Sequence, residues 1–249
     1  MRKAVVGGAI ALAVVTALVL AIFAPHPPSV VEPVETNSAT APTWAAPGPL
    51  PVKSADPHQG LQTRVDADWA QQTAAATGIP VRALLAYAGA AMYKAGQMPE
   101  CGISWSTLAG VGKIESDHGR FGGSELDANG TAVPGIFGIA LDGGNTANVP
   151  DSDNGAIDGD PNSDRAVGPM QLIPQTWRNW HVDGGADGVE DPQNIDDAVA
   201  AAANYLCRSS TAMDTEAGWR AAISAYNSSN TYLSNVAAAA ESYNAAATG

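Results

Sequence analysis

The feature that most limits how this chain can fold is a series of alanine-rich segments that begins near Leu61. In each segment apolar residues recur every three or four positions, which is the period of an α-helix. Gly and Pro stand between the segments, where helices usually end or begin. The expected helices cover residues 63–77, 80–95, 104–118, 174–180, 194–207, 214–226 and 231–243. Because small side chains suit closely packed helices better than sheets, the sequence predicts a mostly α domain over residues 61–249.

A stretch rich in Gly, Asp and Asn, from Gly122 to Gly168, breaks this helical pattern. Structureless segments of this length are uncommon inside a compact domain and are usually functional or disordered. One short apolar patch, with the sequence VPGIFGIAL, lies within the stretch. We expect a long irregular loop that carries a small hairpin.

Acidic residues crowd this loop and the later sequence DGGADGVED, residues 183–191. In the first loop they are Asp151, Asp153, Asp158, Asp160 and Asp164. The second loop partly matches a calcium-binding EF-hand loop, which needs an oxygen ligand at its third position and a Glu at its twelfth. Gly185 and Asn194 occupy those two positions here. We therefore interpret the acids as capping and turn residues rather than metal ligands, and we predict no metal and no cofactor.

The N-terminus has the pattern of an export segment. Met1-Arg2-Lys3 precedes an uncharged apolar run from Ala4 to Ala24, and a basic end before an apolar run directs export. The run is longer than the roughly 7–15 apolar residues of a cleaved signal, so we favour an uncleaved anchor over a signal peptide for residues 1–24. Residues 25–60 are rich in Pro, Ala, Ser and Thr, which predicts a disordered linker.

Cysteine content and net charge narrow the class of protein further. Cys101 and Cys207 are the two cysteines of the chain. In an exported protein such a pair predicts a disulfide, with two free buried thiols as the alternative. The formal net charge of -13 argues against nucleic acid as a partner, because binding to nucleic acid needs a basic surface.

Glu115 is the residue that most strongly suggests chemistry. Four residues at helical spacing share one face of the expected helix: Trp105, Leu108, Gly112 and Glu115. A carboxylate is disfavoured on such a packing face, and also in the last turn of a helix, where the helix dipole is negative. A Glu that keeps its proton near neutral pH can act as a general acid in glycosidic cleavage. The alternative is a solvated helical Glu without a catalytic role.

Three ordered segments carry a family resemblance. They are KIESDHGRFG (residues 113–122), AVGPMQLIPQTW (residues 166–177) and AISAYNSSNTYLSNV (residues 222–236). They resemble, in turn, the Glu-Ser, Gly-x-Met-Gln and Tyr-Asn segments of the lytic transglycosylases, whose helical domain is lysozyme-like. The order of the segments is most similar to the membrane-bound lytic murein transglycosylases of the B type, in the form familiar from actinobacteria. The resemblance covers roughly residues 61–243.

The resemblance implies a specific reaction. Glu115 would protonate the oxygen between N-acetylmuramic acid (MurNAc) and N-acetylglucosamine (GlcNAc) and later take the proton of the muramic 6-hydroxyl. The product would be 1,6-anhydro-MurNAc, formed without water and with help from the acetamido group of the substrate, as in other substrate-assisted enzymes. The resemblance also implies a substrate-binding role for Ser116, Met170, Gln171, Tyr226 and Asn227.

The expected partners are the glycan strands of peptidoglycan and, through the N-terminal segment, the membrane. We expect a cell-membrane protein with an extracytoplasmic catalytic domain, or a protein secreted to the cell wall if the N-terminus is cleaved. Two other functions fit the same features. One is a hydrolytic muramidase that admits water to the same bond, and the other is a catalytically silent protein that binds the cell wall.

Overall fold

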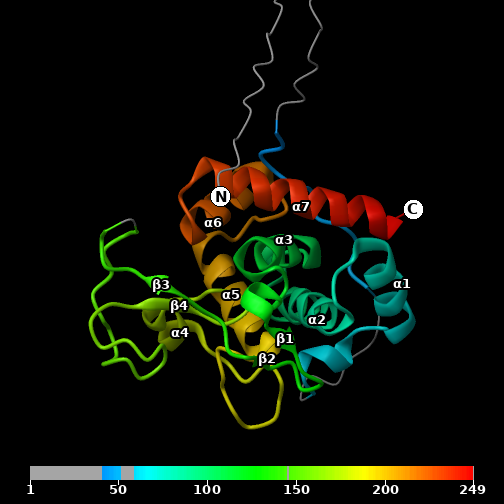
Figure 1. Ribbon diagram of the computed structural model, residues 1–249. Helices are drawn as coiled ribbons and strands as arrows, with labels where there is room; N and C mark the ends of the chain where they lie inside the picture. Colours follow the sequence, from blue (N-terminus) through cyan, green and yellow to red (C-terminus); the bar gives the residue numbers. More distant parts are fainter. Residues whose placement is uncertain (1–40, 52–58, 145, 249) are drawn as a thin grey trace, which may run out of the picture. The chain divides into compact units, whose positions relative to one another are not determined.

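The computed structural model describes residues 41–51, 59–144 and 146–248. Within these ranges the chain forms seven α-helices and two short two-stranded sheets (Figure 1), which confirms the predicted mostly helical, lysozyme-like fold class. The predicted anchor, residues 1–24, and residues 25–40 of the predicted linker lie outside the described residues. Among the described helices, none alone has the length and apolar character to cross a bilayer. The helices over residues 67–77 and 81–97, bent by 118°, meet that criterion only as a pair.

The helix bounds agree with most of the predicted segments. The α-helices are α1 (Ala67–Thr77), α2 (Val81–Gln97), α3 (Trp105–Ser116), α4 (Pro174–Trp180), α5 (Ile195–Ser209), α6 (Glu216–Tyr226) and α7 (Asn230–Thr248). The 3-10 helices are η1 (Leu61–Arg64), η2 (Pro99–Cys101) and η3 (Phe121–Gly123). The predicted helix over residues 63–77 is broken, because Val65 is extended and Asp66 caps α1 by accepting the N–H of Trp69.

The Gly- and Asp-rich stretch carries two strand pairs rather than the single hairpin predicted. Strand β1 (Glu125–Leu126) pairs antiparallel with β2 (Ala132–Val133). Strand β3 (Phe137–Ala140) pairs antiparallel with β4 (Arg165–Val167), in a register that sets Phe137 opposite Val167. Because β4 leads directly into Gly168, the second sheet holds the start of the predicted Met-Gln segment in place.

Helix α3 is the central helix of the domain. Figure 1 shows it between α7 and α2, and it contacts both. Its residues from Trp105 to Gly112 are all buried. Small residues allow this close packing: a Cβ on Gly110 would lie 2.8 Å from the Val236 carbonyl oxygen, and a Cβ on Gly112 would lie 2.0 Å from the Tyr87 hydroxyl. Only the C-terminal turn of α3 reaches the surface, and Glu115 lies in that turn.

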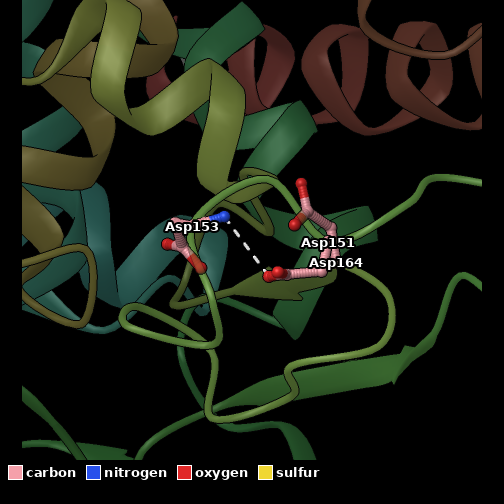
Figure 2. A group of neighbouring side chains, drawn as sticks. All are labelled: Asp151, Asp153 and Asp164. Carbon is pink, nitrogen blue, oxygen red and sulfur yellow. Dashed lines mark hydrogen bonds between the residues drawn. The ribbon is translucent and has the colours of Figure 1, made fainter.

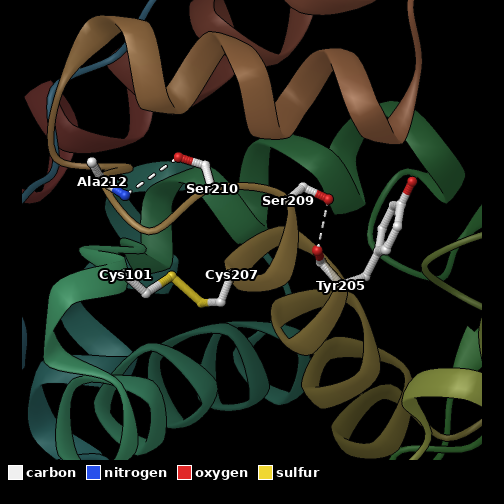
Figure 3. The surroundings of a disulfide bond; sticks show 6 residues. All are labelled: Cys101, Tyr205, Cys207, Ser209, Ser210 and Ala212. Carbon is white, nitrogen blue, oxygen red and sulfur yellow. Dashed lines mark hydrogen bonds between the residues drawn. A yellow bond between two sulfur atoms is a disulfide. The ribbon is translucent and has the colours of Figure 1, made fainter.

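The disulfide joins the segment before α3 to the C-terminal half of α5. Cys101 and Cys207 are bonded across 106 residues of sequence, as predicted (Figure 3). Both cysteines are buried in the core. The bond therefore fixes the N-terminal end of the central helix against a second core helix.

Residues 41–51 of the predicted linker belong to the folded unit, which begins at Thr40. Ala45 is buried, the Asn244 side-chain amide donates to the Ala46 carbonyl at 2.7 Å, and Arg220 donates to the Thr43 carbonyl at 3.3 Å. The prediction of a disordered linker up to residue 60 is wrong for these residues. The Pro- and Ala-rich composition gave no sign of these contacts, in which side chains of α6 and α7 bond to backbone carbonyls of the segment.

Candidate active site

Glu115 is half-buried in the last turn of α3. The helix ends because Asp117 adopts a left-handed conformation with φ 51°, and its N–H still bonds to the helix carbonyls of Gly112 and Lys113. The sequence thus places the carboxyl group where a buried helix face meets the surface. At this position the Glu115 carboxyl group is partly removed from water and is still accessible from the surface.

The hydroxyl of Tyr232, in the first turn of α7, donates a hydrogen bond to Oε1 of Glu115. Burial raises the pKa of Glu115 to about 7, while the hydrogen bond from Tyr232 opposes the rise. Glu115 can therefore hold a proton near neutral pH and also release it. These are the properties of a general acid that later acts as a base.

Tyr226 lies beside this pair but does not contact Glu115 by a hydrogen bond that the structure records. Its hydroxyl donates to the Met170 carbonyl at 2.6 Å. Its ring stacks on that of Tyr232, with centroids 6.5 Å apart and an angle of 7° between the planes. Tyr226 therefore supports Tyr232, which makes the contact with Glu115, and the substrate-binding role of Tyr226 stays a prediction.

Sequence analysis missed Tyr232, although the residue lies within the quoted Tyr-Asn segment. Its burial follows from the helical spacing of Tyr232, Leu233, Val236 and Ala237, which are all buried on the inner face of α7. A tyrosine on a buried helix face needs a partner for its hydroxyl. That requirement was the available signal, and the contact with Glu115 satisfies it.

The Met-Gln segment forms a tight turn from Gly168 to Gln171 between two extended residues, Val167 and Leu172, which bridge each other. Gly168 has φ +75°, and a Cβ there would lie 1.8 Å from the Pro192 carbonyl oxygen, so only glycine fits. The Gln171 side-chain amide donates to the Gly168 carbonyl at 2.9 Å. The turn is held in one conformation.

Met170 has no exposed surface. The Met170 side chain, for which substrate binding was predicted, therefore packs in the core, where a thioether does not touch a ligand. Met170 takes part in the site through its backbone carbonyl, which accepts the Tyr226 hydroxyl.

Ser116 connects the end of α3 to this turn. Its hydroxyl donates to the Pro169 carbonyl at 2.6 Å and accepts the Gly119 N–H at 2.8 Å, and the side chain is buried. The structure records no hydrogen bond from Ser116 to the Glu115 carboxyl group. Ser116 thus fixes the backbone that carries Glu115 rather than the carboxyl group itself.

We expect Ser116→Ala to destabilise the fold by about 1–3 kcal/mol, because it leaves the buried Pro169 carbonyl without this donor. Thermal unfolding followed by circular dichroism measures the loss. Ser106→Ala, which removes another buried hydroxyl of α3 far from Pro169, is the control. An unfolding free energy equal to that of the wild type would contradict the structural role of Ser116.

A pocket of about 220 Å³ lies next to the stacked tyrosines. It is lined by Gln171, Leu172, Ile173, Thr176, Tyr205, Ala225 and Tyr226. The pocket combines aromatic rings with amide and hydroxyl groups, and its volume is below the roughly 300–1,000 Å³ of a typical drug-sized site. The pocket therefore offers room and polar contacts for a small polar group.

Asn227 is exposed at the end of α6. Its side-chain oxygen accepts the Ser229 N–H at 3.0 Å, and Ser229 in turn meets the first turn of α7 through the Tyr232 N–H at 3.4 Å. Asn227 therefore shapes the turn between the helices that carry Tyr226 and Tyr232.

His118 follows the C-terminal end of α3. The ring is buried between the hydroxyls of Tyr87 and Tyr243, at 3.1 and 2.8 Å. Burial lowers the pKa of His118 to about 3, so the imidazole is neutral. It joins helices α2 and α7 to the end of α3.

The acidic side chains of the first loop accept hydrogen bonds from backbone N–H groups of the same loop. In Figure 2, Asp151, Asp153 and Asp164 lie together, and their carboxylate oxygens are within 4.8 Å of one another. Asp151 accepts the N–H groups of Asp153, Asn154 and Gly155, and Asp164 accepts both the N–H and the hydroxyl of Ser152. These contacts agree with the interpretation of the acids as turn residues.

The loop at residues 183–191 has hydrogen bonds of the same kind, from backbone N–H groups to carboxylates. Asp183 accepts the N–H groups of Asp187 and Gly188. Buried Asp197 accepts those of Gly184, Gly185 and Asp191. The carboxylates thus close this loop onto the start of α5.

One protein-family model matches a C-terminal part of the chain. Residues 163–233 match a family model described as a transglycosylase SLT domain. The matched region contains the Met-Gln turn, the pocket, Tyr226 and Tyr232. It begins after Glu115 in the sequence, so Glu115 lies outside the match. No curated protein and no solved structure matches the chain. The matched domain indicates a lytic transglycosylase-type enzyme that acts on peptidoglycan.

Proposed function

We propose that this protein is a membrane-bound lytic murein transglycosylase of the B type, in its actinobacterial form, that cleaves the MurNAc–GlcNAc β-1,4 bond. The observation that carries the proposal is Glu115: a half-buried carboxyl group at the end of the central helix, with a pKa raised to about 7. The transglycosylase match, which covers the adjoining turn and tyrosines, supports it.

In the proposed reaction, Glu115 gives its proton to the glycosidic oxygen as the bond from that oxygen to C1 of MurNAc breaks. The acetamido group of the same sugar stabilises the positive charge at C1. The C6 hydroxyl oxygen then bonds to C1, and the Glu115 carboxylate accepts the hydroxyl proton. The enzyme returns to its starting protonation state, and the products are 1,6-anhydro-MurNAc and a free GlcNAc hydroxyl.

The surroundings of Glu115 support assistance by the substrate. Burial raises the pKa of Glu115, and the hydrogen bond from Tyr232 opposes the rise. Among the described residues, the recorded side-chain hydrogen bond of Glu115 is the one from Tyr232 and not one with a second carboxyl group. Glycosidases that use two carboxylates hold them roughly 5–9.5 Å apart, where each would influence the other, and substrate-assisted enzymes are the exception to that rule. Gln171 and the pocket beside Tyr226 offer amide and aromatic groups to the neighbouring sugar.

We also propose that the enzyme works outside the cytoplasm, held by residues 1–24 in the membrane or released to the wall after cleavage. The disulfide between Cys101 and Cys207 supports an oxidising compartment.

Product analysis tests the proposed reaction. We expect the full chain, incubated with purified sacculi, to release fragments that end in 1,6-anhydro-MurNAc, which is lighter than the hydrolytic product by one water. Mass spectrometry separates the two. Reducing MurNAc ends would favour a hydrolytic muramidase, and binding to sacculi without release of fragments would favour a silent wall-binding protein.

A further inference from the structure

The three residues after Ser116, the last residue of α3, all adopt left-handed backbone conformations. The angle φ is 51° at Asp117, 62° at His118 and 85° at Gly119. Glycine adopts such angles readily, whereas the Cβ atom of other residues disfavours them. Two residues with side chains therefore hold a strained backbone directly behind the turn that carries Glu115, and such strain persists only where the surroundings enforce it.

This left-handed turn closes the end of α3 around Glu115. The His118 N–H donates to the Gly112 carbonyl at 2.9 Å, and the Asp117 N–H donates to the Lys113 carbonyl at 3.1 Å. Left-handed residues at the end of a helix allow the chain to turn back and satisfy the last carbonyls in this way. Glu115 lies between donor and acceptor in both bonds, so the turn fixes the direction in which its side chain leaves the helix.

The side chain of His118 holds the turn in this conformation. The ring is 1% exposed, and its two nitrogens bond to the hydroxyls of Tyr87 in α2 and Tyr243 in α7. The ring also packs against both tyrosine rings, with centroids 5.7 Å apart in each pair. The His118 backbone cannot leave the left-handed region without withdrawing the ring from both hydroxyls.

His118 serves this purpose as a neutral ring. Burial lowers its pKa, and the nearby charged groups that influence its titration are those of Arg120, Asp117 and Lys113. A neutral imidazole has one donor and one acceptor nitrogen, and a tyrosine hydroxyl can match either. The bridge between the two tyrosines therefore stays intact over the pH range in which Glu115 titrates.

We propose that His118 is a positioning residue for Glu115, which it keeps half-buried by fixing the left-handed turn behind α3. This inference rests on the proposed function, because it assigns a role in presenting the proposed acid. Without the bridge, the strained turn relaxes, the last turn of α3 opens, and the carboxyl group of Glu115 gains water. Hydration favours the carboxylate, so the pKa of Glu115 falls toward the ordinary value of a glutamate.

Two substitutions of His118 separate the role of the ring from that of the backbone. His118→Ala and His118→Gly both remove the bridge to the tyrosines, but only glycine adopts the left-handed conformation without strain. Thr107→Val is the control, because it removes a buried acceptor of the Trp219 indole N–H in the first turn of α3. Titration of the Glu115 carboxyl carbon by ¹³C NMR in the full chain reports its pKa without turnover. Its signal is assigned by its absence in Glu115→Gln.

We expect the pKa of Glu115 to fall by roughly 1 in His118→Ala and by less than half as much in His118→Gly. Because Glu115 must hold its proton to act as an acid, the alkaline limb of the kcat profile moves to lower pH by the same amount. With a wild-type pKa of about 7, kcat at pH 7 then falls about fivefold in His118→Ala, while KM stays unchanged. Thr107→Val lowers the melting temperature but leaves the titration and the pH profile in place.

An unchanged Glu115 titration in His118→Ala overturns the inference. It also fails if Thr107→Val moves the titration as far, since the effect would then follow from lost stability alone, or if His118→Gly moves it as far as His118→Ala. If His118→Ala does not fold, Tyr243→Phe, which removes one of the two bonds to the ring, takes its place. A smaller fall in the pKa of Glu115 is then expected, and no fall overturns the inference.

The proposed function fails separately. Digestion of sacculi by Glu115→Gln at the wild-type rate would remove the proposed acid from the reaction. The NMR titration would still decide whether His118 sets the surroundings of that carboxyl group.

Discussion

Glu115→Gln is expected to lower the release of anhydro-muropeptides from sacculi by roughly 10²–10⁴-fold, the range that general acid catalysis contributes. The substitution keeps the size of the side chain and its ability to accept the Tyr232 hydrogen bond, but the amide has no acidic proton to give. Chromatography of the released fragments measures the rate. Digestion at the wild-type rate would remove Glu115 from the mechanism.

The pH dependence of thermal stability provides a control for Glu115→Gln. The pKa of Glu115 is raised by folding to about 7, whereas an unfolded Glu titrates near 4.3. Between these values the folded state keeps a proton that the unfolded chain loses, so the wild type loses roughly 3–4 kcal/mol of stability as pH rises through this window. Glu115→Gln lacks this loss. We therefore expect the variant to match the wild type at pH 4 and to melt higher at pH 8.

Removal of the disulfide is expected to have the largest effect on stability. Cys101→Ser with Cys207→Ser should lower the free energy of unfolding by roughly 4–5 kcal/mol, since the bond closes a loop of 106 residues. For a chain of this size the melting temperature should fall by about 10–15 °C. Differential scanning calorimetry measures it.

The control is activity at low temperature. The disulfide, shown in Figure 3, lies at the N-terminal end of α3. Glu115 lies in the last turn of that helix, so the folded double variant should digest sacculi at a rate close to that of the wild type at 10 °C. A melting temperature within 3 °C of the wild-type value would show that the bond contributes little.

Residue types that start helices predicted the positions of most helices from the sequence alone. Helix α4 begins at Pro174 and ends at Trp180 as predicted, because proline at the first turn is compatible with a helix and opens it. Helix α5 begins after Asn194, whose side chain accepts the Asp196 N–H. These start signals lie within a few residues of the element they define, so the sequence contains them directly.

The detailed site was less accessible to sequence reasoning, because its contacts join distant segments. The Tyr226 hydroxyl meets a carbonyl 56 residues earlier, and Tyr232 meets Glu115 across 117 residues. Spacing placed Glu115 on a buried face, yet it gave no way to decide which tyrosine would reach the acid. The burial of Met170 is likewise a result of tertiary packing.

The packing of residues 41–51 limits the reach of the enzyme. A fully extended chain covers at most about 3.5 Å per residue. If residues 1–24 lie in a bilayer, residues 25–40 can separate the folded unit from the membrane by at most about 55 Å. A connection made of residues 25–60 would allow about 125 Å. This bound would keep the folded unit of an anchored molecule within about 55 Å of the membrane.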